Sequence, residues 1–219
     1  MDETLLLIAP ASLGMALAAV YLLAFAGQPP GLARSLTKTG SVALLALGVA
    51  LAGAPWSLVL GLAASALGDF ALSRPGPRAF LAGMLAFALA HLAYILAILG
   101  YAWGFGALWQ YGALAALVLL LISMLRQLWP RAGALRLPVA AYALIIGAMG
   151  AVAVGGAVSL AGMVVLLGAA LFIISDAVLA AETFLLTPEA SRAAGMPRIV
   201  WVLYYSAQLL LAVGLGNLV

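Results

Sequence analysis

Residues 79–100 read AFLAGMLAFALAHLAYILAILG, a stretch without a single Asp, Glu, Lys or Arg. A helix rises about 1.5 Å per residue and the hydrocarbon core of a bilayer is about 30 Å thick, so roughly 20 apolar residues cross it. This stretch therefore predicts a transmembrane helix. Its apolar residues run continuously instead of alternating with polar ones, which excludes a strand of a transmembrane barrel.

The rest of the chain has the same character. Of its 219 residues 68% are hydrophobic and 7% are charged, whereas soluble domains carry about 25% charged residues. Gly, Pro and charged residues separate eight apolar segments. We expect helices at residues 4–26, 39–54, 56–73, 79–100, 106–127, 137–155, 160–185 and 198–218. The prediction is an all-α, polytopic integral membrane protein with eight transmembrane helices in one transmembrane domain, residues 1–219.

The basic residues predict the orientation of the chain. All nine fall in or beside alternate connections, namely Arg34, Lys38, Arg74, Arg78, Arg126, Arg131, Arg136, Arg192 and Arg198. Because Lys and Arg are retained in cytoplasmic loops, these connections are predicted to be cytoplasmic and both termini non-cytoplasmic. Asp2 and Glu3 give the N-terminus the wrong charge for a signal peptide, so we expect an uncleaved first helix.

Two carboxyl groups lie inside apolar segments. Asp69 lies roughly 7 Å and Asp176 roughly 15 Å from the cytoplasmic edge, at about 1.5 Å per residue. Ionisable groups are costly at such depths and usually serve a function. A structural alternative for Asp69 is an ion pair with Arg74 or Arg78. A Leu-Gly pair precedes each Asp at the same spacing, which leaves open a repeat of two parallel halves.

Most other polar residues of the segments also lie in the predicted cytoplasmic half, which indicates a polar cavity opening on that side. They are Lys38, Tyr142, Tyr204 and Gln208, while His91, with Tyr94 one turn away, lies nearer the middle. His91 could instead only bond a neighbouring helix, and Tyr142, Tyr204 and Tyr205 could be interfacial aromatics. The five tryptophans, Trp56, Trp103, Trp109, Trp129 and Trp201, are expected at the membrane interface.

Other kinds of chemistry find little support. The chain has no Cys, which excludes disulfides and thiolate chemistry. Asp69, Asp176 and His91 are suitable metal ligands, but HxxxH and HxxE spacings are missing, so we predict no metal and no cofactor. The net charge of +3 comes from loop residues, and no nucleic-acid partner is expected.

Several blocks together resemble the YhhN-like lysoplasmalogenase family of membrane proteins. They are Gly68-Asp69, residues 80–94 (FLAGMLAFALAHLAY), residues 142–149, residues 172–176 (FIISD) with Leu179-Ala180, and residues 204–210 (YYSAQLL). Their order and spacing agree over about two-thirds of the chain. Lys38-Thr39 departs from the Lys-Pro of the family, which leaves the role of Lys38 open.

The resemblance implies hydrolysis of the vinyl ether bond of lysoplasmalogens, giving a fatty aldehyde and glycerophosphoethanolamine or glycerophosphocholine. This reaction needs a proton donor to carbon and a nearby carboxylate, as glycosidases also do. Asp176 is expected to be the acid and Asp69 the ionised base or stabiliser. His91, Tyr204 and Gln208 would orient water or the ether oxygen, and Lys38 with nearby arginines would hold the phosphate. Tyr94, Tyr142, Ser175 and Tyr205 complete the candidate substrate-orienting residues.

The expected partners are a lysophospholipid and membrane lipids, with a homo-oligomer left open. The spread of the family and the lack of targeting segments favour the inner membrane of a bacterium. One alternative is a proton-coupled transporter or lipid scramblase that uses the same carboxylates. A second is a structural or sensory membrane protein, in which Asp69 and Asp176 would face different pairs of helices.

Overall fold

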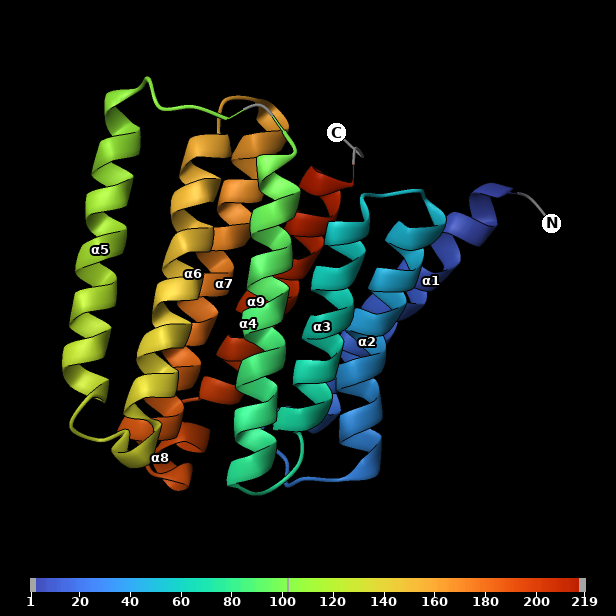
Figure 1. Ribbon diagram of the computed structural model, residues 1–219. Coiled ribbons are helices and arrows are strands. Elements are labelled where there is room, and N and C mark those ends of the chain that lie inside the picture. Colours follow the sequence, from blue (N-terminus) through green and yellow to red (C-terminus); the bar gives the residue numbers. More distant parts are fainter. Residues whose placement is uncertain (1–2, 102, 217–219) are drawn as a thin grey trace.

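The computed structural model describes residues 3–101 and 103–216, and side chains from residue 9 onward. In this part of the chain all regular structure is helical, and the long helices lie side by side along one axis (Figure 1). They are α1 (Glu3–Val20), α2 (Leu32–Leu51), α3 (Trp56–Leu72), α4 (Pro77–Leu99), α5 (Leu108–Leu128), α6 (Arg136–Gly156), α7 (Leu160–Leu185) and α9 (Met196–Leu215). Three short elements complete the described part of the chain: the π-helix η1 (Tyr21–Phe25), the 3₁₀ turn η2 (Gly133–Leu135) and α8 (Pro188–Ala193).

Five of these helices are long and apolar enough to cross a membrane. They are α4, α5, α6 together with η2, α7 and α9. Two shorter apolar helices, Ala9–Phe25 and Trp56–Leu72, accompany them. Because a helix satisfies its own backbone hydrogen bonds, it can cross lipid without polar partners. The protein is therefore an all-α, multi-pass integral membrane protein.

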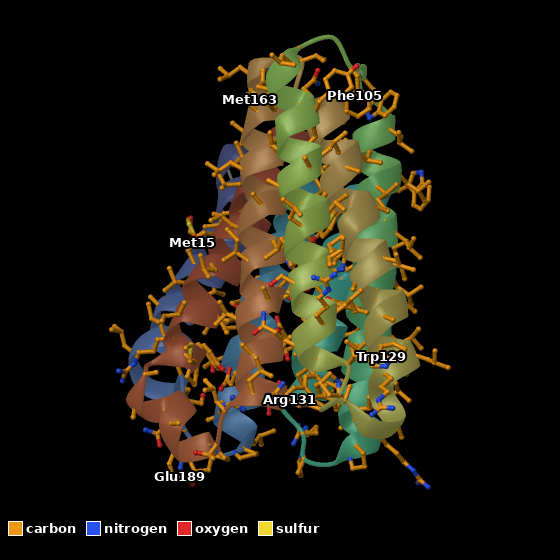
Figure 2. The ribbon with its side chains drawn as sticks, turned by 90° about the vertical axis from the view of Figure 1, so that its left-hand side faces the viewer. Met15, Phe105, Trp129, Arg131, Met163 and Glu189 are labelled. Atoms are coloured by element: carbon orange, nitrogen blue, oxygen red, sulfur yellow. The ribbon has the colours of Figure 1, made fainter. Side chains whose placement is uncertain are left out.

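The basic residues gather at one end of the helical bundle. The connections that carry them, α1–α2, α3–α4, α5–α6 and α7–α9 with α8, all lie at the lower end in Figure 1. Figure 2 shows Trp129, Arg131 and Glu189 at this end and Phe105 and Met163 at the other. Between the two ends, side chains on the outside of the bundle are mainly carbon (Figure 2). We call the end with the basic connections the basic end.

Helix α2 begins much earlier than the predicted 39–54. It starts at Leu32 and ends at Leu51, with its first turns formed by residues that the prediction left in a loop. Ser35 and Ser41 are fully buried, and Ser35 Oγ bonds Ser73 Oγ on the neighbouring α3–α4 connection at 2.8 Å. The polar side chains of these turns are buried or half-buried against other parts of the protein, and a hydropathy criterion for membrane spans overlooks such a helix.

The prediction also placed no helix between residues 185 and 198, where the structure has α8. Thr187 caps α8, its side chain accepting from the Ala190 N–H at 3.3 Å, and Pro188 occupies the first helical position. Gly195 follows with φ of 68°, and α9 then begins at Met196. The predicted end of the last helix, residue 218, lies outside the described residues.

Close packing of α3 on α4 positions two aromatic side chains near the middle of the bundle. Gly61 lies against the ring of Tyr94, and Gly68 lies against the ring of Phe87. A Cβ atom on Gly68 would stand 2.7 Å from the Phe87 ring. Small residues permit this approach of neighbouring transmembrane helices. The same contact holds Phe87 and the following turn of α4, with His91, next to α7.

Candidate active site

A cavity of about 970 Å³ opens at the basic end of the bundle. Its rim is formed by the α1–α2 connection and by α8, and its walls come from α2, α3, α4, α7 and α9. Both intramembrane carboxyl groups, Asp69 and Asp176, line it. Two residues from helices far apart in the chain thus face a single space at the basic end.

Asp69 is fully buried in a set of charged and polar contacts. Lys38 Nζ lies 2.9 Å from Asp69 Oδ1, and the Tyr204 hydroxyl donates to Asp69 Oδ2 at 2.7 Å. Arg74, which the sequence offered as the cation for this carboxylate, instead lies over the Phe70 ring. The Lys38 pairing explains why α2 starts early, because its first turns must reach Asp69 on α3.

Asp176 contacts a tyrosine and a histidine. The Tyr142 hydroxyl donates to Asp176 Oδ2 at 2.5 Å, and His91 Nε2 lies 3.8 Å from the same oxygen. His91 Nδ1 lies 2.6 Å from the Phe87 carbonyl, which can only accept, so Nδ1 carries the ring hydrogen. A neutral His91 therefore turns the unprotonated Nε2 toward Asp176. That Nε2 atom is buried and has no hydrogen-bond partner.

Aromatic rings pack together beside the two carboxyl groups. Phe87 packs edge-on against Tyr204 with centroids 5.7 Å apart, and Phe172 packs edge-on against both rings. His91 lies 4.5 Å from the Phe172 ring. Phe87 also lines the cavity. The electron-rich face of an aromatic ring can stabilise a positive charge that forms next to it during a reaction.

Four further candidates, Tyr94, Gln208, Tyr205 and Ser175, lie in the wall of the cavity or deeper in the bundle. The Tyr94 hydroxyl donates to Gln208 Oε1 at 2.5 Å, and both side chains are fully buried. Tyr205 stacks on Trp201 with centroids 5.5 Å apart. Ser175 lines the cavity but bonds the Val200 carbonyl at 3.1 Å, which ties α7 to α9. These contacts support the walls of the cavity.

Trp201 and Arg34 both line the cavity, although the sequence predicted Trp201 at the membrane interface and did not single out Arg34. Trp201, predicted at the membrane interface, is buried, lines the cavity and donates to the Ala18 carbonyl at 3.0 Å. Trp201, Tyr204 and Gln208 are spaced as i, i+3 and i+7, which places them on one face of a helix, and this spacing could have indicated that Trp201 faces the protein interior. Arg34 lines the rim with its guanidinium over the Tyr21 ring. The other four tryptophans are exposed, as expected of interfacial residues.

The described residues include no group of three His, Asp or Glu side chains arranged to hold a metal ion. Asp69 uses both of its oxygens on Lys38 and Tyr204, and Asp176 uses Oδ2 on Tyr142. The arrangement offers acid–base chemistry by two carboxyl groups whose surroundings differ.

Comparison with known proteins gives a consistent result. The human protein named lysoplasmalogenase TMEM86B is 40% identical over 159 residues, 68% of this chain and 59% of its own length. The rat protein of the same name is 37% identical over 163 residues, 71% of this chain and 60% of its own. The chain thus spans about six-tenths of the length of these relatives, and no solved structure matches it significantly. The model of the YhhN family matches residues 33–215, and the chain belongs to that family.

Proposed function

We propose that this protein hydrolyses the vinyl ether bond of lysoplasmalogens, releasing a fatty aldehyde and a glycerophospho-alcohol. The observation that carries the proposal is that Asp69 and Asp176 line one cavity in unlike surroundings. The names of the human and rat relatives support the same chemistry. A purely structural role would not explain why two carboxyl groups line one cavity among membrane-spanning helices.

The surroundings suggest which carboxyl group is the acid. An isolated carboxylate is very costly to bury, so Asp176, with a tyrosine and a neutral histidine beside it, is suited to the protonated form. Lys38 makes the ionised form favourable for Asp69. The pair then resembles other enzyme sites in which two carboxyl groups hold one proton between them.

The chemical steps follow from these protonation states. The Asp176 carboxyl group transfers its proton to C2 of the alkenyl chain, leaving an oxocarbenium ion at C1. Water bonds to C1 and its proton passes to the Asp69 carboxylate, giving a neutral hemiacetal. The hemiacetal hydroxyl returns its proton to Asp176 as the C1–O bond breaks, and Asp69 protonates the departing glycerol oxygen. Both carboxyl groups thereby recover their initial states.

Other residues have positioning roles in this proposal. Tyr142 and His91 hold the Asp176 carboxyl group, and Tyr204, which lines the cavity, orients water on the Asp69 side. Arg34 at the rim takes the phosphate, because Lys38 is already committed to Asp69. The ring of Phe87 faces the developing positive charge.

The proposal includes a membrane topology. All eight long helices cross the membrane as one domain, the basic end faces the cytoplasm and both termini lie on the other side. The partly polar α2 then crosses between α1 and α3. A bacterial inner membrane is the proposed location.

The test compares two lysolipids that differ only in one bond. Detergent-purified protein is incubated with a 1-alkenyl lysophosphoethanolamine and with its saturated 1-alkyl ether, and free aldehyde is measured by mass spectrometry. We expect aldehyde from the alkenyl lipid only. Uptake of the intact lipid into proteoliposomes, with no aldehyde from either lipid, would instead favour a transporter.

A further inference from the structure

A second, apolar cavity of about 70 Å³ adjoins the polar cavity. It lies between α4, α5, α6 and α7, and its lining includes Met84, Leu121, Met124 and Ala143. Except for Asp176, Tyr142 and Thr183, all of its described lining side chains are apolar. We call this cavity the apolar slot.

The two cavities meet at the reactive carboxyl group. Asp176, Phe87 and Leu179 line both of them. From this junction the polar cavity leads to Arg34 and the basic rim, while the apolar slot leads toward α5. A charged end and an apolar end are thus offered on opposite sides of one carboxyl group.

We propose that the apolar slot binds the hydrocarbon chain of a single-chain lysophospholipid, with its headgroup in the polar cavity. This inference rests on the proposed function. In a lysoplasmalogen the vinyl ether lies between the phosphate-bearing glycerol and the chain. A lipid with its headgroup at Arg34 and its chain in the slot therefore has its vinyl ether bond beside Asp176. A lysophospholipid has one hydrocarbon chain and therefore needs one such slot.

Helix α5 forms the outer wall of the slot and is loosely attached. Only Gln110 and Leu128, near its two ends, are buried among its described residues. Its contacts are mainly with α6, where Gly147 and Gly150 receive the side chains of Leu121 and Leu117. The slot is small beside a long alkenyl chain, so α5 must move outward when the chain enters. A wall with few buried side chains can move at low cost.

The first test fills the slot and leaves the carboxyl groups alone. Ala143→Phe places a ring in the slot from α6, and Ala180→Phe does so from α7. Ala148→Phe is the matched control, because Ala148 is an exposed residue of α6. The probe is a 1-alkyl ether lysophosphoethanolamine with a diazirine near the end of its chain, which the proposed reaction cannot cleave.

In the native protein we expect light-induced labelling of α5 and α6 residues that line the slot, and competition by the unlabelled ether lipid. Labelling should fall at least tenfold in Ala143→Phe and in Ala180→Phe, and remain unchanged in Ala148→Phe. Labelling that is confined to exposed faces and is not displaced by competitor would identify surrounding bilayer lipid and overturn the proposal. Using two slot variants protects the test against misfolding of either one.

A kinetic arm separates this inference from the proposed function. With alkenyl substrates, kcat/KM for a long chain should fall at least tenfold in Ala143→Phe, with a much smaller change for a short chain. Aldehyde formation with equal chain-length profiles in Ala143→Phe and the native protein would overturn the slot and keep the hydrolase. Competed slot labelling without any aldehyde would overturn the hydrolase and keep the lysolipid site.

Discussion

Asp69 and Asp176 carry the same functional group but differ in what their oxygens contact. Asp69 has an ammonium group and a phenol as partners, and Asp176 has a phenol and an imidazole nitrogen. Interaction with a cation favours the charged form of a carboxyl group, and burial without one favours the neutral form. The division of roles between the two residues thus depends on Lys38.

Removal of Lys38 should destabilise the protein. In Lys38→Met the buried Asp69 loses its cation, which in buried pairs costs about 3–5 kcal/mol. We expect a clear fall in the midpoint of thermal unfolding in detergent. Adding Asp69→Asn should recover most of the loss, because the amide needs no counter-ion. Equal midpoints for Lys38→Met and the native protein would show that the ion pair contributes nothing.

Removal of the Tyr142 hydroxyl should slow the reaction. A hydrogen bond to a group that becomes charged is worth about 1.5–3 kcal/mol, so Tyr142→Phe should lower kcat roughly 10- to 100-fold with little change in KM. Tyr111→Phe is the control, since Tyr111 is an exposed residue of α5. A kcat equal to that of the native protein would remove Tyr142 from the acid's surroundings.

At the scale of helices, contact between α3 and α4 holds the site together. Gly68→Val would push against the buried Phe87 ring, and overpacking of this kind costs about 1–3 kcal/mol. We expect a lower unfolding midpoint and reduced turnover, because His91 is one turn from Phe87. Gly112→Val, with open space around it on α5, is the control and should leave both nearly unchanged. Equal effects of the two substitutions would argue against close packing at Gly68.

Some helices could be predicted from sequence and others could not. The predicted 56–73, 79–100 and 160–185 lie within two residues of α3, α4 and α7, because apolar runs with Gly or Pro at their ends report helices directly. Helix α2 was misplaced because its first turns contain Arg34, Ser35 and Lys38. Their partners are Tyr21 on η1, Ser73 at the end of α3 and Asp69 on α3, and hydropathy along one segment does not report such contacts.

At the scale of the whole molecule, charge and geometry coincide. The basic connections and the rim of the polar cavity lie at the same end of the bundle (Figure 1). The sequence indicated a polar cavity on this side, because polar residues of several segments lay at similar heights. It could not give the pairs Lys38–Asp69 or Tyr94–Gln208, because contacts between distant helices depend on how those helices pack.

The proposed orientation of the protein in the membrane can be tested by cysteine labelling. The chain has no native cysteine, so only an introduced thiol would be labelled. Val158→Cys and Ala190→Cys each introduce one exposed thiol, at opposite ends of the bundle. In intact bacterial cells a membrane-impermeant maleimide should label Val158→Cys, and should label Ala190→Cys only after permeabilisation. The reverse pattern would place the basic end outside the cell.

The most direct measurement is aldehyde release from a lysoplasmenyl-ethanolamine in D₂O, followed by mass spectrometry of the product. We expect the native protein and Glu189→Gln, which alters an exposed acid, to release aldehyde carrying one deuterium at carbon 2. Asp176→Asn should fold normally and release none. Undiminished aldehyde from Asp176→Asn, or none from the native protein across lysoplasmalogens of different chain length, would contradict carbon protonation by Asp176.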